Sequence, residues 1–168
     1  MRFLSIFILF VTFSSAVCAQ NKLDKALKKF NQGSVPYIQV HELRALSQPI
    51  LLDTRKREEY TVSHLKDAIW VGHKAFELDS VVPKLKNKDR EIVVYCSIGV
   101  RSENIGEKLQ EAGYKVKNLY GGIFEWKNEG YPVYDSEGKA TENIHAFNKH
   151  WGKLLKNGQK VYDSVNNE

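Results

Sequence analysis

The sequence predicts an α/β domain with a mostly parallel central sheet, on the evidence of two features. Brief apolar runs alternate with helical segments through the middle of the chain, and the clearest run is Glu91 to Tyr95. The run from Pro49 to Asp53 is apolar up to a polar last residue, as expected of a strand that is buried on both faces. Strands that alternate with helices at this spacing are typical of an α/β domain.

The first half of the domain is expected to contain short elements, because its apolar runs are brief. In order along the chain they are an extended piece within Tyr37 to Leu46 that becomes a helix near His41, a strand at Pro49 to Asp53, a helical turn at Lys56 to Tyr60, a strand at Ala68 to Val71 and a helix at about Ser80 to Leu85.

The second half continues the alternation after the strand that ends at Tyr95. A helix is expected from about Ser102 to Ala112, and Gly113 stands where glycine commonly ends a helix. Val116 to Leu119 is the next strand, and it ends in a turn at Gly121 and Gly122.

Two amphipathic helices are expected outside the domain, which is assigned to residues 37–134. Helical spacing of apolar side chains predicts one within the N-terminal extension, residues 20–36, and the residues are Leu23, Ala26, Leu27 and Phe30. Residues 135–168 begin as a polar linker and are predicted to end in a helix that packs back on the domain, with the apolar positions Ile144, Phe147, Trp151 and Leu154.

Residues 1–19 are expected to be a removable export signal. Arg2 gives a positive start, Phe3 to Phe13 is apolar, and Val17 and Ala19 stand where a signal peptidase needs small side chains. The apolar run is well short of the roughly 20 residues that cross a bilayer, which disfavours an uncleaved anchor. We therefore expect no membrane span after cleavage, and a periplasmic location in a bacterial envelope, with secretion as the alternative.

Charge and cysteine content narrow the function further. The chain has 25 Lys and Arg against 20 Asp and Glu, spread in mixed-sign runs, and this does not favour nucleic acid as a partner. Cleavage would remove Cys18. Lipid attachment at Cys18 is disfavoured, because it needs a small residue just before the cysteine and Val17 fits poorly there. Cys96 would then be the single cysteine, so no internal disulfide could form.

Cys96 follows the predicted strand at Glu91 to Tyr95, and strand ends of this kind are where open α/β sheets bind their ligands. The next loop leads into a helix, so backbone N–H groups can converge on one spot near a positive helix end. Arg101 adds a full charge, and Gly99 suits a tight turn. Such surroundings lower the pKa of a thiol from about 8.5 and favour the reactive thiolate. A buried, inert cysteine is the alternative.

The pattern Cys96-x-x-Gly99-x-Arg101 resembles the six-residue active-site loop of rhodanese-homology domains, which are thiosulfate-type sulfurtransferases. Two further motifs of that family are matched in order along the chain. The first comprises Leu51 to Arg55, Glu58-Glu59-Tyr60 and His64 to Ile69. The closing motif is Gly121 to Trp126. Lys66-Asp67 departs from the usual Pro-Gly of the first motif. The resemblance implies a rhodanese-like three-layer domain with helices on both faces of the sheet.

The resemblance also implies roles for individual residues. Cys96 is similar to the family's sulfur-carrying nucleophile, and the resemblance implies neither a metal nor an organic cofactor. The backbone N–H groups expected to bind the persulfide and the incoming anion belong to Ser97, Ile98, Gly99, Val100 and Arg101. Arg101 either binds an anionic substrate or ties the loop to a carboxylate. The residues expected to support the loop are Asp53, Arg55 and Ser102.

The expected reaction has two halves. A small anionic donor such as thiosulfate leaves its outer sulfur on Cys96, and cyanide or a thiol, including a protein thiol, removes it. A related phosphatase or arsenate reductase has five residues between cysteine and arginine, whereas here four separate Cys96 from Arg101. A thiol–disulfide oxidoreductase would need a second cysteine. A non-catalytic binding module and a redox or sulfide sensor are the remaining alternatives.

The histidines are not expected to take part. His64 more often satisfies a turn in this motif than it acts as a base. The other four show no spacing to Cys or carboxylates that would make a metal site, and they are His41, His73, His145 and His150.

Overall fold

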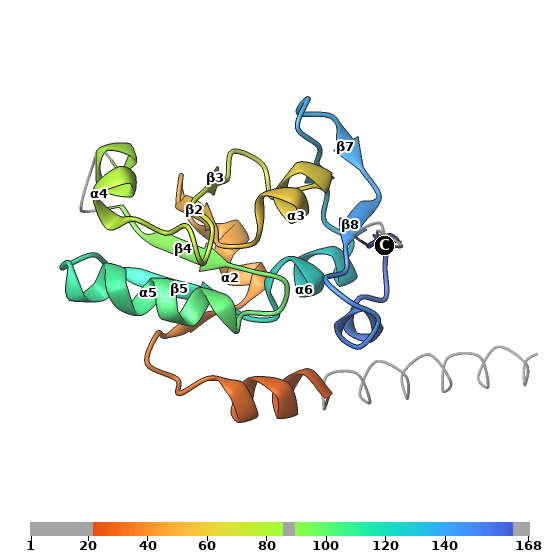
Figure 1. Cartoon of the computed structure of the whole chain (residues 1–168), viewed down its shortest axis with the longest axis horizontal. Helices are drawn as coiled ribbons and strands as arrows, with labels where there is room; N and C mark the ends of the chain where they lie inside the picture. Colours follow the sequence, from red (N-terminus) through yellow and green to blue (C-terminus); the bar gives the residue numbers. More distant parts are fainter. Residues whose placement is uncertain (1–21, 86–89, 163–168) are drawn as a thin grey trace, which may run out of the picture.

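Five short strands form the central sheet in the computed structural model, which describes residues 22–85 and 90–162 (Figure 1). They lie in the order β1-β5-β4-β2-β3 and every neighbouring pair is parallel. The strands are β1 (Tyr37–Ile38), β2 (Ile50–Asp53), β3 (Ile69–Trp70), β4 (Ile92–Tyr95) and β5 (Val116–Leu119). β4 lies at the centre of this sheet, so the residue that follows it is surrounded by structure on both sides.

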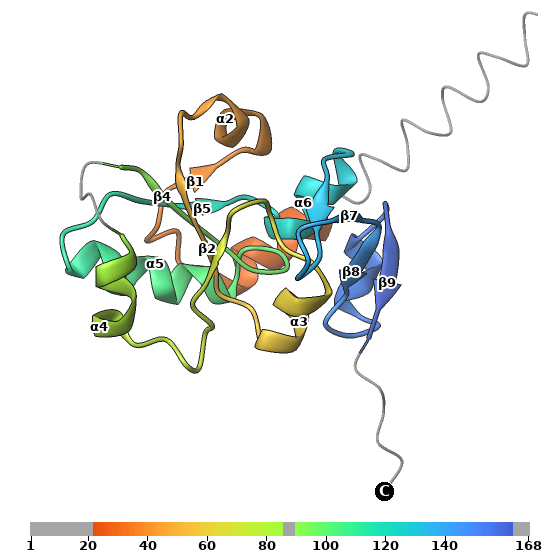
Figure 2. The ribbon, with the colours of Figure 1, turned by 90° about the horizontal axis from the view of Figure 1, so that it is seen from above.

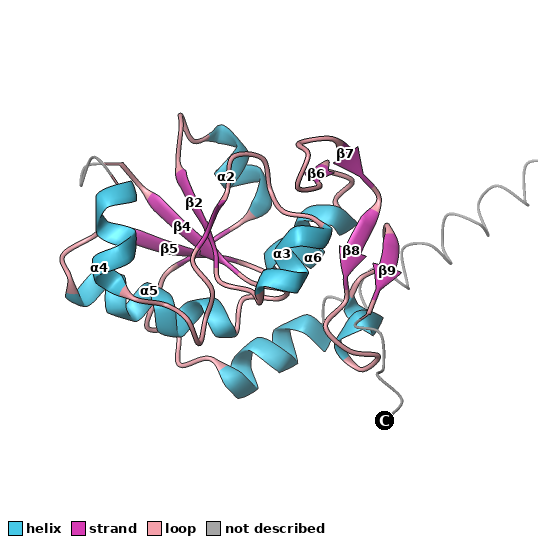
Figure 3. Ribbon diagram, turned by 45° about the horizontal axis from the view of Figure 1, so that its top comes forward, coloured by secondary structure: helices cyan, strands magenta, loops and turns pink. Residues whose placement is uncertain are grey.

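Helices cover both faces of the sheet and make two separate cores (Figure 3). The side chains of β4 alternate between them. Val93 and Tyr95 belong to the core that includes residues of α2 and α6, and Ile92 and Val94 to the core that includes residues of α4 and α5. The helices are α2 (Val40–Ala45), α3 (Arg57–Val62), α4 (Leu78–Val81), α5 (Arg101–Glu111) and α6 (Gly122–Asn128), and a 3₁₀ turn, η1 (Val82–Lys84), follows α4. The predicted three-layer architecture with a parallel sheet is confirmed.

The boundaries of most predicted elements agree with the structure to within a few residues. Gly113 follows α5 with a left-handed φ of 85°, as a glycine at a helix end does. Within the domain, the sequence does not predict the helix α6, because Gly121 and Gly122 indicate only a turn. Both glycines have left-handed φ values, 70° and 55°, and they lead directly into the helix.

The C-terminal amphipathic helix predicted from Ile144, Phe147, Trp151 and Leu154 is wrong. The segment contains β8 (Asn143–His145), a 3₁₀ turn η2 (Trp151–Leu154) and β9 (Gln159–Val161), and the two strands pair in parallel. Helical spacing correctly marked side chains that face the protein, but the backbone turns between them. Phe147 has a left-handed φ of 62°, and the Asn148 side chain accepts the backbone N–H of Trp151 at 3.0 Å.

The C-terminal segment nevertheless packs back on the domain, as expected. Ile144, Ala146 and Leu155 are buried in the core on the α2 and α6 face. Seen from above, β8 and β9 lie beside α3 and α6 (Figure 2). The expected linker is also structured, since β6 (Val133–Tyr134) and β7 (Ala140–Thr141) form an antiparallel pair around its turn.

The N-terminal extension is helical over residues 22–30, as predicted, and Leu23 and Leu27 are buried in the same core. The chain after this helix is held by the Glu103 carboxylate, which accepts backbone N–H groups of residues 32–34 at 2.7 to 3.2 Å. The expected export signal lies outside the described residues. Within residues 22–85 and 90–162, no helix is both long enough and apolar enough to cross a membrane.

Candidate active site

Cys96 follows β4 directly, and the loop that begins with it ends where α5 starts at Arg101. The side chain is buried, with 1 % of the residue exposed. The predicted loop residues therefore converge at one end of the central strand, next to the positive N-terminal end of an 11-residue helix.

Gly99 supplies the hydrogen bond that most directly marks the site. Its backbone N–H donates to Cys96 Sγ at 3.2 Å, and its φ of 103° is open to glycine but strained for other residues. The carbonyl of Gly99 accepts side-chain amides of Asn31 and Asn118 at 2.9 and 2.8 Å. Because the N–H and the carbonyl of Gly99 are both engaged, the residue is held in the loop with its N–H directed at the sulfur.

The N-terminus of α6 fixes the start of the loop. The N–H groups of Ile123 and Phe124 donate to the carbonyls of Cys96 and Ser97 at 3.0 and 3.1 Å. A Cβ on Gly122 would lie only 2.3 Å from the Cys96 carbonyl oxygen. The closing Gly-Gly motif therefore lets a helix end approach the cysteine backbone closely.

Arg101 is tied to a carboxylate, which is one of the two roles expected for it. Its guanidinium donates to both oxygens of Glu59 at 2.6 and 2.8 Å, in a bidentate pair. It also donates to Ser97 Oγ at 2.9 Å, and Ser97 donates to Glu59 at 3.1 Å. The Ser97 hydroxyl is thus engaged in holding the loop.

These charges shift the ionisation of the site. Burial alone would raise the pKa of the Cys96 thiol, but the Arg101 charge and hydrogen bonds from Ser102 and the Ile98 backbone outweigh it and lower that pKa below its ordinary value. The Ser102 hydroxyl donates to Asn118 Oδ1 at 2.8 Å in this structure, and a hydroxyl can rotate toward a thiolate. The arrangement favours negative charge on sulfur.

Glu59 is ionised for the same reason. Burial would raise its pKa, but the hydrogen bonds and charge of Arg101 lower the pKa to about 2. The positive charge near Cys96 is therefore offset by a fixed carboxylate at ordinary pH.

Asp53 and Arg55 form a buried ion pair at the end of β2, at 2.7 Å. The Arg55 guanidinium also donates to the carbonyl of Ser63, and the N–H of Thr54 donates to the carbonyl of Tyr95 at 3.0 Å. These contacts join the end of β2 to the residue just before Cys96. Asp53 and Arg55 therefore lie at a strand end next to that of β4, and their role in supporting the loop stays a prediction.

The mouth above Cys96 is a cavity of about 130 Å³. Its outer wall is aromatic and comes from both extensions, with Phe30 from the N-terminal helix and Phe147 and Trp151 from the C-terminal segment. Phe30 and Trp151 meet edge to face, with ring centroids 5.7 Å apart. Residues outside the predicted domain, 37–134, therefore limit access to the sulfur.

Sequence reasoning missed six contributors to the site: Asn31, Glu59, Asn118, Phe30, Phe147 and Trp151. Asn118 had a signal, because a polar residue inside a buried strand needs a partner. Glu59 belongs to the first family motif, but the motif alone does not indicate which role the residue has. The aromatic wall had no local signal, since apolar periodicity does not show which surface a residue covers. His64 stacks on Tyr60 with ring centroids 4.0 Å apart, which agrees with its expected structural role.

Comparison with known proteins identifies the family. The rhodanese-like domain family matches residues 39–129, more than half of the chain. A tRNA uridine(34) hydroxylase of Sodalis glossinidius is 31 % identical over 138 residues, which cover 75 % of this chain and 38 % of that protein. The adenylyltransferase and sulfurtransferase UBA4 of Candida albicans is 30 % identical over 118 residues, covering 67 % of this chain and 26 % of that protein. The chain thus spans well under half the length of these relatives.

Solved structures agree on the fold. The thiosulfate sulfurtransferase of Pseudomonas aeruginosa superimposes with a TM-score of 0.55 at 23 % identity, over 72 % of this chain and 23 % of that one. The rhodanese-like domain of the Anabaena protein Alr3790 superimposes with a TM-score of 0.54 at 26 % identity, over 60 % of this chain and 79 % of that one. By its sequence match and its fold, the chain belongs to the rhodanese-like domain family.

Proposed function

We propose that this protein is an exported sulfurtransferase that carries sulfane sulfur as a persulfide on Cys96. The observation that carries the proposal is the hydrogen bond from the Gly99 N–H to Sγ, in a loop where the Arg101 charge also favours a thiolate. Groups that favour a negative sulfur in the resting enzyme also suit a persulfide, whose outer sulfur carries the charge.

In the first half-reaction the Cys96 thiolate attacks the outer sulfur of an anionic donor such as thiosulfate. A new S–S bond forms to Sγ, and the bond within thiosulfate breaks, so that sulfite leaves with the electron pair. In the second half-reaction cyanide or a thiolate attacks the outer sulfur of the persulfide. The S–S bond to Sγ then breaks, and the thiolate of Cys96 is restored.

The comparisons support sulfur transfer at the level of the family. One relative is named a sulfurtransferase, and it is matched over 26 % of its length. Another is named a tRNA uridine(34) hydroxylase, and the chain covers 38 % of it. Sulfur transfer is preferred because it needs only the loop described above, with four residues between Cys96 and Arg101. The loop is also one residue shorter than that of a related phosphatase or arsenate reductase, which disfavours those activities.

The test is the intact mass of the purified protein after incubation with thiosulfate. We expect a gain of one sulfur atom, reversed by cyanide and lost in Cys96→Ser. The protein is tested after signal cleavage, as residues 20–168, in which Cys96 is the single cysteine of the sequence. If the thiol of Cys96 reacts with alkylating agents but gains no sulfur from thiosulfate or polysulfide, sulfur transfer is wrong and the sensor or binding module replaces it.

Export is part of the proposal, on the pattern of residues 1–19. Expression of the full chain in a bacterial host should yield periplasmic protein that begins at Gln20. Recovery of the uncut chain from the cytoplasm would contradict this part of the proposal and leave the chemistry of Cys96 unaffected.

A further inference from the structure

A second cavity, of about 380 Å³, opens beside the mouth above Cys96. The two cavities share two wall residues, Arg101 and Phe147. The mouth, at about 130 Å³, is smaller than the roughly 300 to 1,000 Å³ of typical ligand pockets, whereas the second cavity is within that range. A small sulfur group fits the mouth, and an organic group attached to it requires the second cavity.

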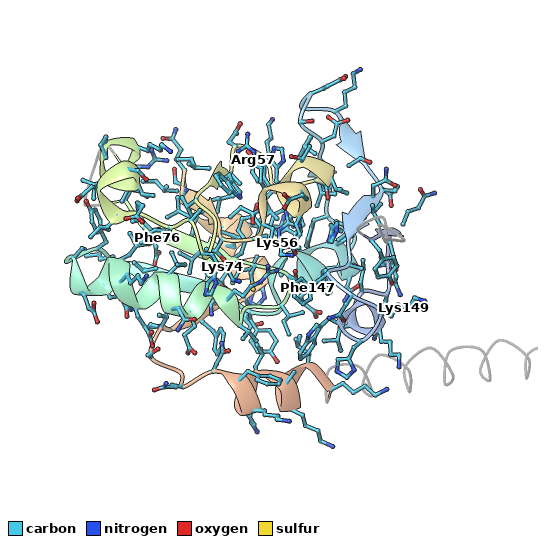
Figure 4. All side chains as sticks on the ribbon, in the orientation of Figure 1. Lys56, Arg57, Lys74, Phe76, Phe147 and Lys149 are labelled. Atoms are coloured by element: carbon cyan, nitrogen blue, oxygen red, sulfur yellow. The ribbon has the colours of Figure 1, made fainter. Side chains whose placement is uncertain are left out.

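The second cavity is positively charged. Lys56, Arg57 and Lys74 line it and are exposed, and within residues 22–85 and 90–162 none of them forms an ion pair with an acidic side chain (Figure 4). Glu58 is the one carboxylate among the lining residues that the structure describes. Three cations around one opening attract an anion and favour its binding.

The walls between these charges are apolar, which suits the carbon chain of an organic anion. Trp70 lines the cavity, and the Arg57 guanidinium lies over its ring at 4.9 Å. Arg55 lines the cavity as well, and its buried Nη1 has no hydrogen-bond partner among the described residues. An N–H donor without a partner beside a cationic cavity is a second observation that points to an anionic ligand.

Phe147 lines both cavities. Its ring lies over the Arg101 guanidinium at 4.8 Å, and its backbone has the left-handed φ of 62° that non-glycine residues seldom adopt. Such strain persists where surrounding structure imposes it, often at ligand sites. Phe147 lies beyond residues 39–129, so this wall is added to the matched family domain by the C-terminal segment.

We propose that the second cavity binds the carboxylate-bearing arm of an organic thiol, which accepts sulfur from the Cys96 persulfide. The inference rests on the proposed sulfur transfer. The thiol reaches past Phe147 as its thiolate, after losing its proton to solvent, and attacks the outer sulfur. The new S–S bond makes an organic persulfide, the old S–S bond breaks, and its electron pair returns to Cys96 Sγ. No outside oxidant or reductant is needed.

The test loads the protein that begins at Gln20 with sulfur from thiosulfate, removes the donor, and follows discharge of the persulfide by intact mass. The acceptors are mercaptosuccinate, with two carboxylates, mercaptopropionate, with one, neutral mercaptoethanol and cationic cysteamine. For each protein variant the rate constant is divided by that for mercaptoethanol. Comparing this ratio between variants cancels the intrinsic reactivity of each thiol.

We expect the ratio for mercaptosuccinate to fall roughly fivefold in Arg57→Ala, and by a similar factor in the separate variant Lys74→Ala. This is the effect of losing one cation about 4 Å from a carboxylate in water. It should also fall as salt is raised, because exposed charges are screened. Lys149→Ala is the control, since this exposed lysine of the C-terminal segment lines neither cavity (Figure 4). Circular dichroism checks that each variant is folded, and Lys56→Ala replaces one that is not.

Three results would overturn the inference, and they are distinguishable. If the persulfide discharges with equal ratios in all variants, the proposed subsite is wrong, whereas the proposed sulfur transfer is unaffected. Equal loss of the ratio in Lys149→Ala assigns the preference to overall charge instead of this cavity. A protein that never gains sulfur removes the proposed function and the subsite together.

Discussion

The Glu59 carboxylate is fully buried and accepts hydrogen bonds from both Arg101 and Ser97, so a single charge holds two residues of the active-site loop. Breaking one partner of a buried pair leaves the other charge without compensation, which costs more than the pair contributes. The stability of the loop is therefore linked to the ionisation of one acid.

The first prediction concerns stability against pH. The pKa of Glu59 falls from 4.5 to about 2 on folding, so its stabilisation is complete above pH 4.5 and is lost as the pH falls toward 2. Glu59→Gln should lower the free energy of unfolding by about 3 kcal/mol at pH 7 and flatten its decline between pH 4.5 and 2. Urea denaturation across this range measures both. The exposed neighbour Glu58→Gln is the control, and an equal loss in both variants would contradict the argument.

The second prediction concerns the reactivity of the thiol. The Arg101 charge is the foremost of the influences that lower the pKa of Cys96 against burial, so Arg101→Gln should raise that pKa. The rate of alkylation by iodoacetamide should then rise at a higher pH than in the wild type. Arg90→Gln changes an exposed arginine that donates to the Gln48 carbonyl, and it serves as the control. An unchanged pH profile in Arg101→Gln would show that the backbone N–H groups suffice.

Among single residues, the sequence predicted those whose role follows from local order along the chain. Cys96, Gly99 and Arg101 are close in sequence, and a strand followed by a helix must bring them together. Asn31, Glu59 and Asn118 reach the loop from three distant parts of the chain, and their neighbours in sequence do not indicate that they meet there. Their roles depend on how the sheet and helices are placed.

The helix α6 acts on the site through its first turn, where Ile123 and Phe124 donate to the carbonyls of Cys96 and Ser97. The approach is close because Gly122 has no side chain. A helix of only seven residues thereby determines the path of the loop that follows β4.

The third prediction tests that contact. Gly122→Ala places a Cβ 2.3 Å from the Cys96 carbonyl oxygen, so the loop or the helix must move, and persulfide formation should slow severely. Gly113→Ala is the matched control. It has a left-handed φ of 85° with nothing within 4 Å of the added Cβ, so it should cost about 1 to 2 kcal/mol of backbone strain and leave sulfur loading unchanged. Similar loading by both variants would show that the close approach is unimportant.

At this scale the strands of the sheet were predictable and the C-terminal elements were not. Ile92 to Tyr95 is buried throughout, and a continuous apolar run predicts such a buried strand directly. Ile144, Phe147, Trp151 and Leu154 are spaced as in a helix, but side-chain burial does not specify backbone hydrogen bonds. The pairing of β8 with β9 joins residues 16 positions apart, such as Asn143 and Gln159, which a local pattern does not contain.

Over the whole molecule, both extensions are integral to the fold. The C-terminal segment places Ile144, Ala146 and Leu155 in the core, and the N-terminal helix adds Leu23 and Leu27. The α/β class and the parallel sheet were predictable, because they follow from the alternation of buried strands and helices. The closure of the extensions over the active site was not, because it depends on long-range packing.

The fourth prediction follows from this packing. Truncation after Tyr134 removes two fully buried side chains, Ile144 and Leu155, each contributing about 1.5 to 3 kcal/mol. The loss of roughly 3 to 6 kcal/mol is a large part of the 5 to 15 kcal/mol typical of a domain. Thermal unfolding should show a much lower midpoint or no cooperative transition. A truncated chain as stable as the full one would make the C-terminal segment an accessory.

Under the proposed sulfur transfer, the burial of Cys96 behind the Phe30, Phe147 and Trp151 side chains would affect the lifetime of the persulfide. A persulfide exposed to the medium loses its sulfur to whichever nucleophile is most abundant. Behind a mouth of about 130 Å³, the half-life of the loaded enzyme is set by which molecules can enter, not by their concentration alone. A sulfurtransferase of this kind would therefore keep its sulfur between encounters until an acceptor that fits the mouth arrives.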